Sequence, residues 1–145
     1  VTDSQINPAD VSPELTKHFR GPRMWLPLQL HGLKPFVACL DEKLLLTTYF
    51  RNRLIEIGFE VGPEPDLTVS YFWCPSKKVD ENKYNEKLME IIHNDGSIFL
   101  SSTKIEGKFV IRMAILSFRT KKATIDKAIQ MIEKCVDETN KYFNV

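Results

Sequence analysis

The sequence contains few of the residues that mark specialised classes of protein. Its 145 residues include three cysteines, an odd number, and these are far apart in the chain. This spacing excludes a disulfide framework and a cysteine-based metal site, and it is typical of reduced thiols in a cytoplasmic protein. Only six glycines are present, and they form neither a phosphate-binding loop nor a nucleophile elbow. No metal-ligand spacing is visible, so no metal is expected.

Neither the charge nor the hydropathy of the chain favours nucleic acid or a membrane as a partner. The 20 basic and 19 acidic residues leave a net charge of +1, which creates no large field that would attract either one. No apolar run approaches the roughly 18 residues of a membrane span, and no secretory signal is visible. A hydrophobic content of 43% is ordinary for a globular domain. We therefore expect one cytoplasmic domain or part of one.

The chain also lacks an initiating methionine, since it opens with Val1. We therefore expect a fragment, a processed subunit or a trimmed product of a longer protein. The first 20 residues are polar and rich in turn signals, which predicts an extended lead-in with a short helical turn near Glu14–His18.

The most informative pattern lies between Gly96 and Leu116, where β-branched and aromatic residues alternate on both sides of Glu106-Gly107. This pattern predicts two strands joined by a two-residue turn. In that register one face is mostly apolar, and the other carries Ser101 opposite Arg112. A slip by one residue would exchange the two faces, and Glu-Gly is not an ideal turn sequence.

Apolar spacing and breakers predict the other elements. We expect helices at 21–31, 35–57, 83–93 and 121–141, the last capped by Thr120 or Thr124, and strands at 59–61 and 67–73. The long helix has an expected stripe of Val37, Leu40, Leu44, Thr47 and Leu54, widened by Leu45, Leu46, Tyr49 and Phe50. So wide a stripe indicates contacts on two sides, and we expect this helix to lead away from the sheet.

The order of elements from residue 59 onward is β-β-α-β-β-α, which predicts the α+β class. We expect a four-stranded, mainly antiparallel sheet with both helices on one face. The other face, with Arg112, Ser101 and Thr103, is left for solvent, a partner or a missing domain.

Arg112 is the strongest candidate for a binding residue, because a guanidinium presents a fixed fork of donors that suits a carboxylate or a phosphate. The alternative is a surface arginine that pairs with an acid on a neighbouring strand. His18 with Arg20 and Arg23 is a second candidate, for an anion ahead of the first helix. Its alternative is an exposed basic loop.

Two stretches carry a resemblance to a known family: FRGPRMWLPLQLHG at 19–32 and KFVIRMAI at 108–115. The first resembles the segment that ends the large domain of the group II pyridoxal-phosphate (PLP) decarboxylases, and the second their small-domain strand. This family includes the aromatic-L-amino-acid, histidine and glutamate decarboxylases. The strand at 67–72, the helix at 83–93 and the residues Ser101–Thr103 follow in the order expected for the family.

The resemblance implies the C-terminal part of a type I aminotransferase-like fold. Residues 1–33 then end the large domain, 34–58 form a long linking helix, and 59–145 form the small α+β domain. The rest of the large domain is missing from the N-terminal side, and the intact enzyme is expected to be a homodimer.

The resemblance also implies which functional residues are absent and which are present. The lysine that binds PLP in this family lies upstream, and none of Lys17, Lys34, Lys104 or Lys108 matches its motif. We therefore expect no catalytic residue and no bound PLP in this chain alone. Arg112 matches a small-domain arginine that approaches the substrate carboxylate in related decarboxylases. His18, Arg20 and Gly21 align with a loop near the active site.

The implied function of the intact protein is decarboxylation of an aromatic or related amino acid. Two other classes stay open. One is a free-standing α+β binding module, in which Arg112 and the open sheet face bind a small anion or a second copy. The other is a degenerate, non-catalytic relative that serves as a structural subunit.

Overall fold

The computed structural model describes residues 18–145. The helical turn predicted near Glu14–His18 lies outside the described residues except for His18 itself. The chain forms two compact units, one ending at Val37 and the other spanning Ala38–Val145. Each unit is described by itself.

The first unit contains helix α1, Gly21–His31, which confirms the predicted helix. Pro22 lies in its first turn, where the N–H that proline lacks would have no partner within the helix. The helix ends at Gly32, whose N–H donates to the carbonyl of Leu28 at 2.9 Å. None of the helix residues is buried.

The second unit is built on the predicted four-stranded antiparallel sheet. Its strands lie in the order β1-β2-β4-β3, and every neighbouring pair is antiparallel. The strands are shorter than predicted: β1 is Glu60–Val61, β2 is Val69–Trp73, β3 is Ser101–Ile105 and β4 is Lys108–Ala114.

The β3–β4 hairpin has the predicted register, with Ser101 opposite Arg112 and Lys104 opposite Phe109. Glu106 and Gly107 both have positive φ, 50° and 80°, as the mirror-image two-residue turns require. Asn82, in the helix α3 (Glu81–Asp95), holds this turn from outside the hairpin. Its amide donates to the carbonyl of Gly107 at 2.9 Å, and its side-chain oxygen accepts from the N–H of Phe109 at 2.7 Å. A contact distant in sequence therefore secures a register that the Glu-Gly turn alone specifies weakly.

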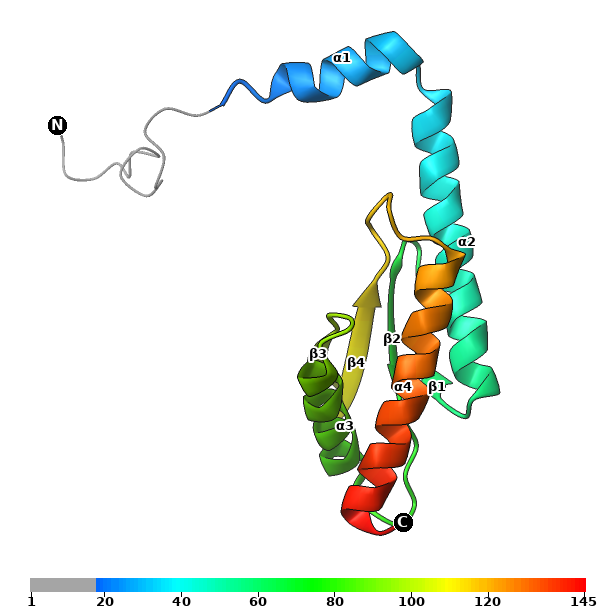
Figure 1. Cartoon of the computed structure of the whole chain (residues 1–145), viewed down its shortest axis with the longest axis vertical. Coiled ribbons are helices and arrows are strands. Elements are labelled where there is room, and N and C mark those ends of the chain that lie inside the picture. Colours follow the sequence, from blue (N-terminus) through cyan, green and yellow to red (C-terminus); the bar gives the residue numbers. More distant parts are fainter. Residues whose placement is uncertain (1–17) are drawn as a thin grey trace, which may run out of the picture. The chain divides into compact units, whose positions relative to one another are not determined.

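Helices α3, Glu81–Asp95, and α4, Lys122–Phe143, lie side by side over one face of the sheet (Figure 1). Their core side chains meet Ile111 and Phe72, which are directly opposite each other in the β2–β4 ladder. The predicted cap of α4 is wrong, because the N-cap is Lys121. Thr120 lies one residue earlier, with its carbonyl bound by Lys43, and Thr124 lies within the first turn.

Helix α2, Lys34–Glu56, corrects the predicted apolar stripe. Leu40 and Leu44 are exposed, while the buried side chains are Lys43, Leu46, Thr47, Phe50 and Leu54. The Phe50 ring meets the Phe72 ring edge-on, with centroids 5.6 Å apart. The second half of α2 therefore packs on the helix-covered face of the sheet and does not lead away from it.

Candidate functional site

Arg112 lies on the open face of the sheet, as the hairpin pattern predicted. Its neighbours Ile111 and Phe109 point toward the helix layer, so alternation along β4 places the guanidinium on the opposite side. The Nε of Arg112 donates to the hydroxyl of Ser101 at 3.1 Å, and Tyr71 is its cross-strand neighbour on β2. Within residues 18–145 no carboxylate lies within ion-pair distance of Arg112, so the predicted alternative of a strand-to-strand ion pair does not hold there.

An aromatic and cationic group continues the open face beyond Arg112. The rings of Tyr71 and Trp73 stack with centroids 6.3 Å apart. The ammonium of Lys108 lies 4.2 Å from the centre of the Trp73 ring and 3.0 Å from a carboxylate oxygen of Glu81. These side chains border a hollow of about 260 Å³, which is lined by Tyr71, Trp73, Ile105, Glu106, Lys108 and Val110. Inference from the sequence missed this group, although the alternation of β2 already separates Tyr71 and Trp73 from Phe72.

Tyr71 is held by a close approach of the backbone. A Cβ on Gly62 would lie 2.3 Å from the Tyr71 ring, so only glycine fits there without movement of the ring. The N–H of Gly62 donates to the carbonyl of Tyr71 at 2.9 Å. Arg51 of α2 donates to the carbonyl of Gly62 at 2.7 Å and to the hydroxyl of Ser70 at 2.9 Å. Arg51 of α2 therefore holds the β1 edge of the sheet against β2, the strand that carries Tyr71.

The other predicted site residues belong to the first unit. His18 and Gly21 are exposed, and Gly21 begins α1. Arg20 is the N-cap residue, and its carbonyl accepts from the N–H of Arg23 at 3.1 Å. Arg112 belongs to the second unit.

Titratable groups with shifted pKa values lie on the helix side of the sheet. Burial raises the pKa of the Cys74 thiol and of the Tyr84 phenol. Tyr84 donates to the side-chain oxygen of Asn140 at 2.7 Å, which joins α3 to α4. Burial also raises the pKa of Cys135 to about 11. Tyr84 and Cys135 lie in the hydrophobic core and Cys74 packs against it, so none of these groups belongs to the open face.

Two further observations concern residues 18–145 as a whole. They contain no cluster of histidine, cysteine or acidic side chains that could hold a metal ion. None of their helices combines the length and the hydropathy that crossing a membrane requires.

No family model matches the chain, but individual relatives do. Tyrosine decarboxylase 2 of Arabidopsis thaliana is 27% identical over 91% of this chain, and tryptophan decarboxylase 2 of Oryza sativa is 29% identical over 96% of it. An aromatic-L-amino-acid decarboxylase of Bacillus atrophaeus is 27% identical over 91% of the chain. The chain spans only 25%, 28% and 28% of these three relatives.

Solved structures share the fold of the chain. The Oryza sativa enzyme TDC, solved with PLP and tryptamine, superposes with a TM-score of 0.77 at 20% identity. The match covers 91% of this chain and 29% of that one. The glutamate decarboxylase domain of a Vibrio parahaemolyticus enzyme gives a TM-score of 0.74 at 22% identity, with 85% and 27% covered. The fold is that of the C-terminal portion of PLP-dependent decarboxylases.

Proposed function

We propose that this chain, a relative of the aromatic-amino-acid decarboxylases, is the C-terminal part of an enzyme that releases CO2 from an aromatic or related amino acid with PLP as cofactor. Support comes from the relatives, which are decarboxylases and whose similarity covers about nine-tenths of this chain. Residues 1–33 would end the large domain, 34–58 would link the domains, and 59–145 would form the small domain. The intact enzyme would be a cytoplasmic homodimer whose remaining large domain precedes this segment.

Three lysines in the described residues, Lys34, Lys104 and Lys108, are poor candidates for the lysine that binds PLP. Lys34 and Lys104 are exposed, and Lys104 and Lys108 are paired with carboxylates of α3 at 3.5 and 3.0 Å. We infer that the cofactor lysine lies in a segment outside this chain, and that the chain alone neither binds PLP covalently nor decarboxylates. Incubation with PLP, reduction with borohydride and peptide mass spectrometry should find no specifically labelled lysine. Stoichiometric labelling of a single lysine would overturn this inference.

We assign Arg112 to the substrate carboxylate. Its guanidinium is exposed on the open face, is oriented by Ser101, and has no carboxylate partner within the described residues that would neutralise it. A fixed fork of donors holds both oxygens of a carboxylate, and this sets the direction of the bond from Cα to the carboxylate. Arg112 would therefore bind the substrate and hold it in the orientation in which CO2 can leave. The surrounding aromatic pair offers apolar contact beside the guanidinium.

The test is the Arg112→Met variant of the full-length enzyme. A charge-assisted hydrogen bond contributes roughly 1.5–3 kcal/mol, so kcat/KM should fall by about 10- to 150-fold. Arg112→Lys should restore little, because lysine keeps the charge but loses the fork. Thermal melting should change little, since the side chain is exposed and not part of the core.

Lys104→Met is the matched control, because it removes an exposed cation from the same hairpin but on the opposite face of β3. It should leave kcat/KM within about twofold of the wild type. If Arg112→Met melts far lower yet keeps a normal kcat/KM, the arginine is structural and the assignment is wrong. A full-length protein that is well folded and loaded with PLP but decarboxylates no aromatic amino acid would overturn the proposed function itself.

A further inference from the structure

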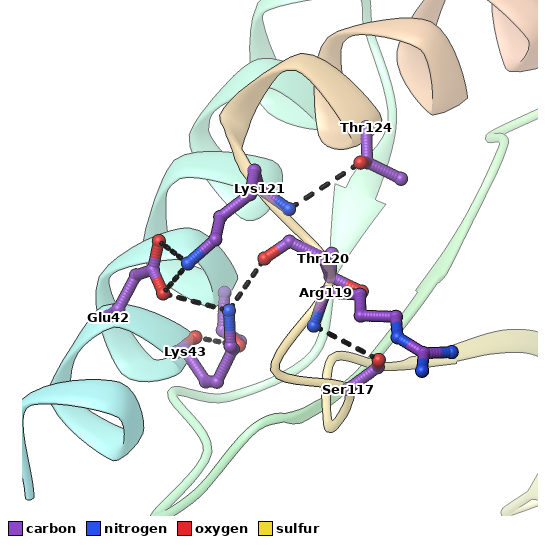
Figure 2. A network of polar contacts seen from close by, with 8 residues as sticks. Glu42, Lys43, Ser117, Arg119, Thr120, Lys121 and Thr124 are labelled. Carbon is purple, nitrogen blue, oxygen red and sulfur yellow. Dashed lines mark hydrogen bonds and ion pairs between the residues drawn. The ribbon is translucent and has the colours of Figure 1, made fainter. Parts of the chain in front are cut away.

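Lys43 is a lysine in the core of the second unit. Only 2% of its side chain is exposed, because it lies on the same stripe of α2 as Leu46, Phe50 and Leu54. A buried ammonium destabilises a fold unless its charge and its N–H donors are satisfied. Lys43 donates to the carbonyl of Thr120 at 2.6 Å and to a carboxylate oxygen of Glu42 at 3.0 Å (Figure 2). The first of these bonds joins residues that are 77 positions apart in the chain.

The carbonyl that Lys43 binds belongs to the loop between β4 and α4. This loop begins after Ile115, which is buried and donates its N–H to the carbonyl of Thr68 at 3.0 Å. From residue 116 to residue 121 no side chain is buried, and Leu116 and Phe118 are largely exposed. Apolar packing therefore does not fix the conformation of the loop. Its order must come from polar contacts.

Within the loop, these polar contacts form one turn. The N–H of Thr120 donates to the carbonyl of Ser117 at 3.0 Å. Figure 2 shows the second bond, in which the N–H of Arg119 donates to the Ser117 hydroxyl at 3.2 Å. The turn directs the Thr120 carbonyl toward α2, where it accepts a hydrogen bond from the Lys43 ammonium. The bond from Lys43 is the contact that joins the turn to the core.

Lys121 provides a second connection between the loop and α2, through Glu42. Its ammonium lies 2.7 and 2.9 Å from the two Glu42 carboxylate oxygens. Because Lys121 is exposed, water competes for this ion pair and it stabilises little. Lys43 is different, because its side chain is almost fully buried and little water can replace Thr120 and Glu42 as its partners.

We propose that Lys43 is a positioning residue that locks the loop 116–121 to α2 and so holds the end of the Arg112 strand and the start of α4 in one conformation. The exposed pair Phe118 and Arg119, whose guanidinium lies 5.2 Å from the Phe118 ring centre, is thereby presented in a fixed orientation. The lock depends only on contacts within this chain and does not rest on the proposed decarboxylase function.

Amide hydrogen exchange on the 145-residue chain tests the lock. In Lys43→Met, which keeps the length and loses the charge, the amides of Arg119 and Thr120 should exchange about 10- to 100-fold faster. The amides of Cys74 and Phe109 should be unchanged, because they donate at 2.7 Å to side-chain oxygens of Asn85 and Asn82 on α3, which Lys43 does not contact. In the wild type the Lys43 ammonium should also give a slowly exchanging ¹H–¹⁵N signal.

Two control variants separate the lock from general effects. Lys121→Met removes the exposed ion pair between Lys121 and Glu42. Tyr49→Phe removes another hydrogen bond between α2 and α4, which the Tyr49 hydroxyl donates to Asp126 at 2.6 Å. Both should change loop exchange by less than about threefold and should keep the slow ammonium signal. If Lys43→Met does not fold, Glu42→Gln should still speed loop exchange more than Lys121→Met does.

The proposal fails if the loop amides of the Lys43→Met variant exchange at the same rate as those of the wild type. It also fails if they speed up by the same factor in the loop, at Cys74 and at Phe109, because Lys43 would then act only on global stability. Absence of a slowly exchanging ammonium signal in the wild type would equally contradict it.

Discussion

The three cysteines differ in how far the fold buries their thiols. Cys135 is buried on α4 and its pKa is raised to about 11, so at pH 8 hardly any of it is thiolate. Cys39 lies in the first half of α2 and is partly exposed. We expect iodoacetamide at about pH 8 to modify Cys39 quickly, Cys74 slowly and Cys135 only after unfolding. Peptide mass spectrometry after timed labelling measures this order, and rapid labelling of Cys135 in the folded chain would contradict the burial described here.

Glu42 should make stability depend on acidity. Hydrogen bonds from Lys121, and next from Lys43, lower the pKa of Glu42 below its ordinary value of 4.5. A carboxyl whose pKa is lower in the folded state stabilises the fold above the unfolded pKa, and this contribution disappears as the pH falls through the folded pKa. Glu42→Gln should therefore be less stable than the wild type near neutral pH, and the two should converge below pH 4.5. Urea unfolding at several pH values measures the difference, and a gap that widens with acidity would refute the account.

At the scale of elements, the turn of the β3–β4 hairpin combines a favourable residue with an unfavourable one. Gly107 tolerates its positive φ at no steric cost, whereas Glu106 adopts a left-handed conformation that glutamate disfavours. Gly107→Ala should cost about 1 kcal/mol of unfolding free energy, and Glu106→Asn should gain about 0.5 kcal/mol. Glu106→Gln, which has no left-handed preference, is the control and should be neutral. Equal stability of all three variants in urea would show that the turn residues do not set hairpin stability.

Helix α2 contacts the strand β2, which lies next to the strand that carries Arg112. The second half of α2 supplies Phe50 to the core beneath Phe72, and Arg51 holds the backbone of Gly62 beside Tyr71. One helix therefore fixes both the core side and the outer edge of β2. Since Tyr71 is the neighbour of Arg112, disturbance of α2 should reach the open face through β2.

At the scale of the whole molecule, the exposed apolar side chains favour association. Trp25 and Leu26 of α1 are exposed. On α2, the exposed fraction is 64% for Leu40 and 71% for Leu45. Leu46 and Phe50, which the wide apolar stripe of α2 also includes, are buried and do not contribute to the exposed apolar area. Large apolar patches on a soluble chain mark contacts with other protein.

We expect the isolated chain to self-associate at micromolar concentration or to bind a hydrophobic dye. The double substitution Leu40→Lys with Leu44→Lys places two charges one helical turn apart on exposed positions and should shift the chain toward the monomer. Leu67→Lys, at an exposed position elsewhere in the chain, is the control and should not. Sedimentation velocity measures the shift, and a clean monomer without dye binding would contradict the expectation.

The sequence by itself determined the order of elements and the antiparallel hairpin, and it placed Arg112 on the side opposite Ile111. Alternation with a period of two residues is a local property of a strand, so Ile111 and Arg112 had to face opposite sides once the register was set. The identity of the residue made Arg112 the candidate for binding a carboxylate, because a guanidinium presents a fixed fork of donors. The short motifs at 19–32 and 108–115 also determined the resemblance, because they depend on residue identity and not on packing.

Only the tertiary structure decided which face of α2 is buried and what the polar residues around it do. A helix with apolar side chains on most of its surface does not specify its buried side, and the choice depended on contacts with Phe72 and the loop before α4. Lys43 became a core residue for the same reason, since no local pattern predicts that a carbonyl 77 positions away will meet an ammonium. Likewise, Asn82 fixed the hairpin turn from another helix. Long-range polar contacts of this kind exist only after the chain has folded, because their geometry is set by the packing of distant elements.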